Sequence, residues 1–302
     1  MVTFEFPSKE VLHRLRNQQN KFEENTLLWP NIFVNASTSN FQKKIHESSL
    51  SLLCNFKGEA ICKINRRNLK ICTDTFLLVN CYETFEYEIT TNRLTETSNL
   101  HFNYSFLQEI LSLHTTSNEL LLENCNTSTE IPVFKTQLNY KDDSFKALLT
   151  VPCFINKEVA ENNLALILLK LIEQQKNLRL ILENINAIKH SVRQELFRRV
   201  TLAKDYIYSN YNNNFSMDLL AKEVGMSKFH FLRTFKSVYG ISAYQLLKMV
   251  RMERAKTLLK ETEFPPTVIS VLVGFEEPNS FFQAFKNYTD FTPTSWRISN
   301  IK

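Results

Sequence analysis

The sequence predicts an α+β chain of two domains. The first is a β-rich barrel or sandwich with accessory helices, and the second is all-α, with two helix-turn-helix units joined by a long helix. Three observations predict this organisation. Short apolar runs fill residues 49–104, helical periodicity begins near residue 158, and two similar segments lie in the last ninety residues. The domains are placed at 1–185 and 190–302.

The N-terminal strands are predicted from runs rich in leucine, β-branched and aromatic residues, which turn-like pieces separate. These runs are LSLLCNF, EAICKI, NLKI, TFLLVN and FEYEI. Inside such a barrel, apolar side chains either fill the core or line a cavity for a small-molecule effector. The candidates for either role are Phe56, Phe76, Phe85 and Tyr87.

Apolar residues at helical spacing predict two helices after this region, over about 158–184 and 190–211. The first of them carries one continuous stripe formed by Leu164, Leu168, Leu171 and Ile172. Asn212, Asn213 and Asn214 end the second.

Two segments near the C-terminus repeat one pattern, at Leu219–Leu247 and Val268–Arg297. Each has a short apolar helix ending at a Val-Gly pair, a polar turn, and a helix closing on Phe-Lys. Glycine suits the turn because it adopts positive φ without a Cβ penalty, which assigns this role to Gly225 and Gly274. A plain helical bundle with glycine stops would explain one copy, but two copies favour helix-turn-helix units.

A connecting helix is predicted over about 242–260. At 1.5 Å per residue it would be about 28 Å long. Successive major grooves on one face of B-DNA repeat at about 34 Å. One rigid helix could therefore hold two recognition helices in adjacent grooves, with some bending of the DNA.

The charge is uneven along the chain. Residues 1–192 carry 20 Lys and Arg against 21 Asp and Glu, whereas residues 193–302 carry 16 against 10. The net charge of +5 therefore lies on the C-terminal part, which favours a polyanion such as nucleic acid as its partner. Surface lysines that serve only solubility are the alternative.

Composition excludes several classes of protein. The chain has only four glycines, which argues against phosphate-cradling glycine loops. The N-terminus lacks a signal-peptide pattern and no apolar run is long enough to cross a bilayer, so we expect a cytoplasmic protein without a membrane partner. The six cysteines include no CxxC pair and are expected to be buried thiols.

Residues 190–302 resemble the DNA-binding domain of AraC/XylS-type transcription regulators. The resemblance rests on LAKEVGMS, RMERAKTLL, the Gly274-Phe275 pair, AFK and the closing TPTSWR. It implies a sequence-specific regulator in which the third and sixth helices of this domain read adjacent major grooves of promoter DNA. The sequence departs from the family pattern at Asp290, where a glycine usually ends the sixth helix. Asp tolerates the left-handed conformation, so we expect that turn to form.

By position in this family, eight residues are expected to face base edges: Phe229, Leu232, Arg233, Pro278, Asn279, Ser280, Phe282 and Gln283. Arginine can bind guanine with two hydrogen bonds, amides read adenine, and aromatic rings contact thymine methyls. Lys228, Lys236 and Lys286 are expected to bind phosphate. A solvated helix face is the alternative for these residues, and core packing is the alternative for Phe229 and Phe282. Glu276 and Glu277 would repel phosphate, so the first unit is expected to supply more of the affinity.

The β-rich front resembles the cupin-like sensor domains that precede this DNA-binding module. Metal-binding cupins need two histidines one residue apart, a spacing that none of the six histidines has, so no metal or other cofactor is expected. The resemblance implies a homodimer held by the Leu164–Ile172 stripe, and contact with RNA polymerase. A cupin-type enzyme or small-molecule carrier with an accessory helical domain is the alternative function.

Overall fold

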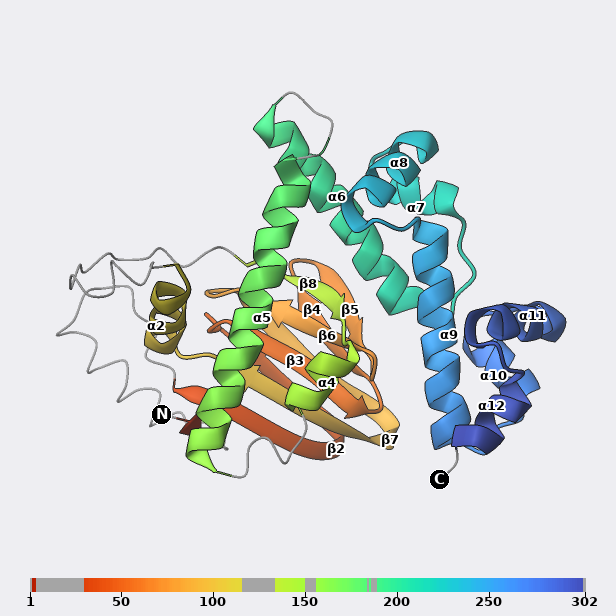
Figure 1. Cartoon of the computed structure of the whole chain (residues 1–302), viewed down its shortest axis with the longest axis horizontal. Helices are drawn as coiled ribbons and strands as arrows, with labels where there is room; N and C mark the ends of the chain where they lie inside the picture. The colour runs from red at the N-terminus through yellow and green to blue at the C-terminus, as the bar shows by residue number, and fades with distance from the viewer. Residues whose placement is uncertain are drawn as a thin grey trace. The chain divides into compact units, whose positions relative to one another are not determined.

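The computed structural model describes residues 2–3, 30–115, 134–149, 156–183, 185 and 189–300. The chain divides into two compact units, Met1–Arg179 and Leu180–Lys302. The first unit contains a β-sheet with helices, and the second consists of helices (Figure 1).

The N-terminal unit is built on one curved sheet, and the structure describes eight strands of it. They are β1 (Val2–Thr3), β2 (Asn31–Ile45), β3 (Ser51–Lys57), β4 (Ala60–Ile64), β5 (Arg67–Ile71), β6 (Thr75–Val79), β7 (Phe85–His101) and β8 (Gln137–Tyr140). The main order is β1-β2-β7-β3-β6-β8, with β4 pairing both β5 and β7. All described pairs are antiparallel except β1 with β2.

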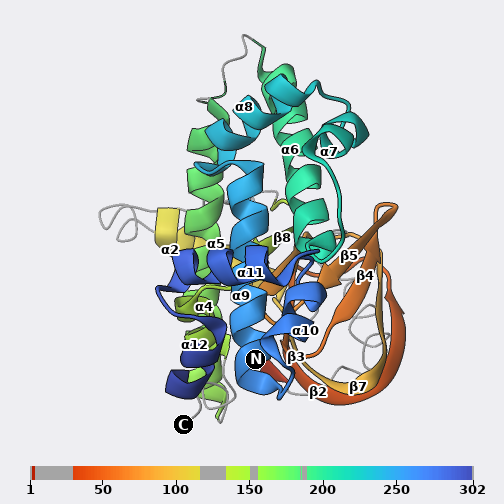
Figure 2. The ribbon, with the colours of Figure 1, turned by 90° about the vertical axis from the view of Figure 1, so that its right-hand side faces the viewer.

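The long strand β7 gives the sheet its near-barrel shape. β2 pairs along its whole length, whereas β4 pairs with its first part and β3 with its last part. The sheet therefore curls around β2 and β7, which form its outer wall in Figure 2. This architecture confirms the β-rich barrel expected from the sequence. The five predicted runs all form strands, and β1, β2 and β8 are additions to them.

Three described helices belong to this unit: α2 (Tyr104–Thr115), α4 (Asp143–Leu149) and α5 (Lys157–Glu183). In Figure 1, α5 crosses one face of the sheet. A single hydrophobic core joins these helices to the sheet, and it includes Leu52, Phe76, Leu107, Phe145 and Leu168.

The stripe predicted for dimerisation is part of this core. Leu164, Leu168, Leu171 and Ile172 are at most 3% exposed and pack with sheet residues of the same unit. Their side chains are therefore not available to a second chain, which corrects the prediction for these four residues. An apolar stripe at helical spacing indicates burial, but it does not say against what.

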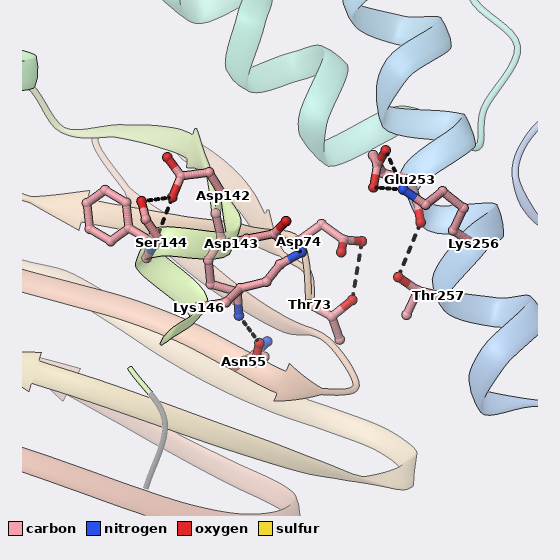
Figure 3. Close-up of polar contacts among 12 residues, drawn as sticks. Asn55, Thr73, Asp74, Asp142, Asp143, Ser144, Lys146, Glu253, Lys256 and Thr257 are labelled. Atoms are coloured by element: carbon pink, nitrogen blue, oxygen red, sulfur yellow. Dashed lines mark hydrogen bonds and ion pairs between the residues drawn. The ribbon is translucent and has the colours of Figure 1, made fainter. Parts of the chain in front are cut away.

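Asp142 fixes the start of α4 against this core. Its Oδ1 accepts hydrogen bonds from Ser144 Oγ at 2.6 Å and from the Phe145 backbone N–H at 2.8 Å (Figure 3). The same oxygen lies 3.0 Å from Lys170 Nζ on α5. The carboxylate thus caps one helix and ties it to the next, because it accepts from the orphan N–H groups of the first turn.

The C-terminal unit is all-α in its described residues, as predicted. Its helices are α6 (His190–Asn210), α7 (Met217–Glu223), α8 (Lys228–Tyr239), α9 (Ala243–Glu261), α10 (Pro266–Leu272), α11 (Pro278–Thr289) and α12 (Pro293–Asn300). α7 and α8 lie near the start of α9, and α10 to α12 lie beside its later part (Figures 1 and 2). This arrangement confirms two helix-turn-helix units joined by one long helix.

No helix within the described ranges has the length and apolar character needed to span a membrane. In the same ranges, no group of three or more His, Cys, Asp or Glu side chains is placed to hold a metal ion. Cys54, Cys62 and Cys72 are buried free thiols and Cys81 is half-buried. Cys125 and Cys153 lie outside the described residues.

Candidate nucleic-acid interface

The first helix-turn-helix consists of α7 and α8, and local sequence sets its helix ends. Ser216 caps α7 by accepting a hydrogen bond from the Leu219 backbone N–H at 3.1 Å. Gly225 makes the turn at a φ of +67°. Ser227 occupies the N-cap position of α8, although its side chain makes no capping hydrogen bond. Gly240 ends α8 at a φ of +73°, as expected for a glycine C-cap.

One face of α8 is buried and the other faces solvent. The buried face consists of Phe231, Thr234, Phe235 and Val238. On the opposite face Phe229 is 82% exposed, which excludes core packing for this ring within the described chain. Arg233 and Lys236 are exposed, and the side chain of neither makes an ion pair or a hydrogen bond with the described residues. Leu232 is half-buried at the edge of this face.

Lys228 differs from the other predicted contacts because it already has a partner. Its Nζ lies 2.7 Å from Asp218 Oδ2 on α7. The hydrogen bond with this carboxylate raises the pKa of the Lys228 ammonium. Both groups are exposed, so a phosphate group could replace the carboxylate at little cost.

The second helix-turn-helix consists of α10 and α11. Gly274 makes its turn at a φ of +88°, and Pro278 occupies the first turn of α11. Glu277 takes the N-cap position of α11, and its side chain makes no capping hydrogen bond. Asp290 ends the helix at a φ of +64°, so the aspartate adopts the left-handed conformation predicted for it.

The exposed face of α11 is polar. Phe281 and Phe285 are fully buried, and Asn279, Ser280, Gln283 and Lys286 lie on the solvent side. Gln283 Nε2 donates to Asn287 Oδ1 at 2.8 Å, a contact that leaves the Gln283 carbonyl oxygen free to accept.

Two side chains of α11 lie between the buried and exposed faces. Phe282 is half-buried against the core of this unit, with its ring centroid 5.7 Å from that of Phe281. One part of the Phe282 ring therefore packs against the core, while another part is exposed at the surface. Pro278 is also half-buried, at the first position of the helix.

Charge distinguishes the two helix-turn-helix modules, the first formed by α7 and α8 and the second by α10 and α11. Glu276 and Glu277 are exposed immediately before α11, and Lys286 is the only Lys or Arg on that helix. α8 carries Lys228, Arg233 and Lys236 instead. The first module therefore has more positive charge to offer a phosphate backbone.

The connecting helix α9 begins with a capping box. Gln245 N donates to Ser242 Oγ at 3.2 Å, and Ser242 N donates to Gln245 Oε1 at 2.8 Å. The later part of α9 contributes Met252, Ala255 and Leu259 to the core of the second module. Because α9 also packs on α6 and α8, this one helix supports both modules.

Sequence reasoning did not identify Arg251, which lies in the middle of α9. Its Nε donates to the Tyr211 carbonyl at 2.8 Å and its guanidinium stands 5.3 Å from the centre of the Phe275 ring. No sequence motif marks these contacts of Arg251, because its partners are mostly backbone carbonyl groups.

The N-terminal unit holds a cavity of about 160 Å³ on the inner face of its curved sheet. Its lining residues come from β2, β3 and β7, and they are Val34, Ala36, Thr38, Phe41, Lys43, Ile45, Leu53, Phe85, Tyr87, Ile89, Thr97, Asn99 and His101. The register shifts between Thr38 and Asn40, where a step of two residues on β2 is matched by a step of five on β7, and beyond this irregularity Phe41, Lys43 and Ile45 line the cavity. A cavity of about this volume can hold a ligand the size of benzene.

Two of the four predicted cavity residues line it and two do not. Phe85 and Tyr87 face the cavity. Phe76 lies in the core under the helices, with its ring centroid 4.7 Å from that of Phe145. Phe56 packs under the ammonium of Lys141, which is 4.8 Å from the ring centre. Phe56 and Phe76 therefore have the core-packing role that the sequence left open.

Some of the side chains that line the cavity are polar. Tyr87 Oη lies 2.9 Å from Thr97 Oγ1 and donates to Asn55 Oδ1 at 3.2 Å. His101 Nδ1 lies 2.7 Å from Ser51 Oγ. Burial, and secondarily Lys43, lowers the pKa of His101 to about 4, so this imidazole is neutral near pH 7.

Comparison with known proteins places the similarity in the C-terminal unit. A family described as a helix-turn-helix domain matches residues 220–299. The multiple antibiotic resistance protein MarA of Salmonella typhimurium is 32% identical over 97 residues, which are 32% of this chain and 76% of MarA.

Two solved structures are also similar. The C-terminal domain of AraT, a response regulator from Geobacillus stearothermophilus, is 30% identical; the match covers 34% of this chain and 87% of AraT's, with a TM-score of 0.34. A probable AraC family transcriptional regulator from Rhodopseudomonas palustris is 20% identical, with coverages of 35% and 99% and a TM-score of 0.32.

Proposed function

Because this chain belongs to the AraC family of helix-turn-helix DNA-binding transcription regulators, we propose that α8 and α11 read two adjacent major grooves on one face of promoter DNA. The observation that carries this proposal is the solvent-facing side of each recognition helix, supported by one 19-residue helix, α9. That helix is about 28 Å long, close to the groove repeat of about 34 Å. Bending of the DNA toward the protein would close the difference.

Within this proposal, the exposed side chains divide into two roles. Arg233, Asn279 and Gln283 read base edges, since guanidinium and amide groups match the donor and acceptor patterns of guanine and adenine. Phe229, Leu232 and the exposed edge of Phe282 contact thymine methyls, and Pro278 and Ser280 complete the base-facing surface at the start of α11. Lys228, Lys236 and Lys286 bind phosphate and set the salt dependence.

We place the regulatory domain at 1–185 and the DNA-binding domain at 190–302. The cavity beside Phe85 and Tyr87 would bind a small-molecule effector, whose polar group would face the Tyr87 and Thr97 hydroxyls. A regulator that binds promoter DNA must lie in the same compartment as that DNA, so a cytoplasmic location is part of this proposal. Contact with RNA polymerase at the promoter is also part of it. None of the comparisons supports an enzyme or a carrier.

The homodimer is proposed on a different surface from the one expected. The inner stripe of α5 is buried, but Leu166 on the same helix is 51% exposed. Sedimentation of the wild-type chain and of Leu166→Glu tests this surface. A monomeric variant and a dimeric wild type would support it, whereas a dimer in both would place the contact elsewhere.

The main test is a gel-shift assay with duplex DNA from upstream of the chain's own gene. We expect a specific complex that weakens steeply as salt rises, because phosphate contacts release counterions. The experiment is run with and without cell extract, which supplies any effector. Absence of specific, salt-sensitive binding in both conditions would overturn the proposed function.

A thermal-shift screen of metabolites tests the effector cavity independently. A ligand that binds the folded protein raises its melting temperature by mass action. Tyr87→Phe should reduce the shift for a ligand that bonds to this hydroxyl, while Phe76→Leu should lower basal stability and leave the shift unchanged. Equal shifts in wild type and Tyr87→Phe would exclude the hydroxyl as a ligand contact.

A further inference from the structure

Arg251 lies at a junction of three segments that are distant in sequence. One is α9 itself. The second is the loop that leaves α6, where Arg251 Nε donates to the Tyr211 carbonyl at 2.8 Å and its Nη2 donates to the Asn213 carbonyl at 3.2 Å. The third is the turn of the second module, where the guanidinium faces the Phe275 ring at 5.3 Å.

The loop and the turn also touch each other directly. A Cβ built on Gly274 would lie 2.9 Å from the carbonyl oxygens of Tyr211 and Asn212, and 2.9 Å from Arg251 Nη2. Glycine is therefore the one residue that lets the three segments meet so closely. The Asn214 side chain adds a hydrogen bond to the carboxylate of Glu276.

This junction joins the two modules. The loop at residues 211–215 connects α6 to α7, so it is the entry of the first module. The turn at Gly274 precedes α11, so it sets where the second recognition helix begins. A guanidinium can make several directed hydrogen bonds from one rigid plane. The guanidinium of Arg251 also lies at the C-terminal end of α6, where positive charge is favoured.

Among the described residues, the first module has no equivalent link. Arg199 of α6 lies against Gly225 and donates to its carbonyl oxygen, so both turn glycines contact an arginine from a preceding long helix. The polar partners of Arg199 are Gly225 and Glu195, and Glu195 lies on α6 itself. Arg199 thus positions one turn, whereas Arg251 connects two modules.

We propose that Arg251 is the positioning residue that fixes the distance and rotation between the two recognition helices, and thereby the spacing of the two DNA half-sites that the protein accepts. This inference rests on the proposed function, since it requires both α8 and α11 to read DNA. Two linked modules bind tightly only when their geometry matches the two sites, because a loose connection lowers the effective concentration of the second module.

The experiment uses the full chain and duplexes that the wild type selects from a random 30-base-pair library. From the selected sequence we make duplexes with one base pair inserted between the half-sites, and duplexes with the second half-site scrambled. One inserted base pair rotates the half-sites by about 34° relative to each other. Affinity is measured by fluorescence anisotropy, and folding by thermal unfolding.

We compare the wild type with Arg251→Met, and with Lys248→Met as a control that removes one positive charge from the same helix. The wild type and the control should bind the inserted duplex about tenfold more weakly than the selected one. Arg251→Met should bind the selected and the inserted duplex with affinities within about threefold of each other. Its affinity for the scrambled duplex should equal that of the wild type. Asn214→Ala should also reduce the affinity difference between the selected and the inserted duplex, but to a smaller extent. This variant keeps the test valid if Arg251→Met does not fold.

The outcomes are distinguishable. A folded Arg251→Met protein that keeps the tenfold spacing penalty would overturn the inference and leave the proposed function intact. Equal weakening of all three duplexes would also overturn it, because a general loss of charge or of fold would explain that result. A wild-type chain that selects no sequence would overturn the proposed function, and the inference with it.

Discussion

Lys228 Nζ at the start of the first recognition helix lies 2.7 Å from Asp218 Oδ2 on the preceding helix. The pair lies at the positive end of the α8 dipole, where phosphate groups of bound DNA would be favoured. If Lys228 binds phosphate as proposed, the carboxylate occupies that position in the free protein. Under the proposed function, Asp218 would compete with DNA for this ammonium.

Asp218→Asn should strengthen DNA binding. Without the carboxylate, Lys228 gains a phosphate contact without first losing an ion pair. The slope of log affinity against log salt should become steeper by up to about 0.9, the value for one additional phosphate contact. Anisotropy titrations at several salt concentrations measure this change. Glu223→Gln, an exposed carboxylate on the same helix, controls for loss of negative charge alone. Equal effects of the two substitutions would contradict a specific role for Asp218.

Arg233→Ala should cost about 1–3 kcal/mol on the selected site and relax discrimination at one base pair. The reason is that guanidinium bonds to base edges carry sequence information. Lys236→Ala, one turn away on the same exposed face, should weaken binding to all sequences alike and reduce the salt slope by about 1. Affinities for the selected duplex and its single-base variants measure both effects. A uniform loss for Arg233→Ala would mean that its side chain binds phosphate.

The recognition helices were predictable because their signals are local. Gly225, Gly274 and Gly240 mark backbone positions of positive φ, and the apolar residues between them recur at helical spacing. These two features place the exposed face of each recognition helix to within a residue. The role of Arg251 was not predictable in this way, because its acceptors are backbone carbonyls about forty residues away.

Strand β2 shows where local signals fail in the N-terminal unit. Its middle reads NASTSN, a composition typical of loops. The strand forms because β7 offers hydrogen-bonding partners along its length, such as Ser98 opposite Asn35 and Thr95 opposite Thr38. Because this pairing uses backbone hydrogen bonds, it requires no strand-like pattern in the side chains that face solvent.

Gly274→Ala should destabilise the C-terminal unit more than Gly225→Ala does. Both glycines have positive φ, which costs an L-residue about 1–2 kcal/mol. At Gly274 the new methyl group would also meet two rigid backbone carbonyls at 2.9 Å, whereas at Gly225 it meets the flexible side chain of Arg199 at 3.2 Å. Chemical denaturation measures the free energy of unfolding. Gly240→Ala is the matched control, since it has positive φ and open space around it. Equal losses at all three positions would contradict the close contact at Gly274.

Asp290→Gly should stabilise the C-terminal unit by about 1 kcal/mol, because glycine adopts the left-handed C-cap without the cost that a Cβ imposes. Asp290 is exposed and has a φ of +64°, and it has no side-chain partner among the described residues, so little is lost with the carboxylate. Asp290→Ala is the control and should destabilise, since alanine tolerates this conformation less well than aspartate. Thermal unfolding of the three proteins tests the order Gly, Asp, Ala. An alanine variant as stable as the wild type would show that the helix end relaxes.

His101 should make the N-terminal unit less stable as the pH falls from about 6.5 to 4. The imidazole is 3% exposed, and burial together with the charge of Lys43 lowers its pKa to about 4. The unfolded chain takes up this proton near pH 6.5 and the folded chain does so only near pH 4. Over this interval the unfolded state binds more protons, so stability falls with decreasing pH, by about 3 kcal/mol in total for this residue. Denaturation of wild type and His101→Gln at several pH values isolates the effect, because all other titrating groups are shared. The difference in unfolding free energy between the two proteins should shrink as the pH falls, and parallel curves would show that His101 titrates alike in both states. Lys43→Met provides a second variant with a shallower dependence, since it removes the neighbouring positive charge.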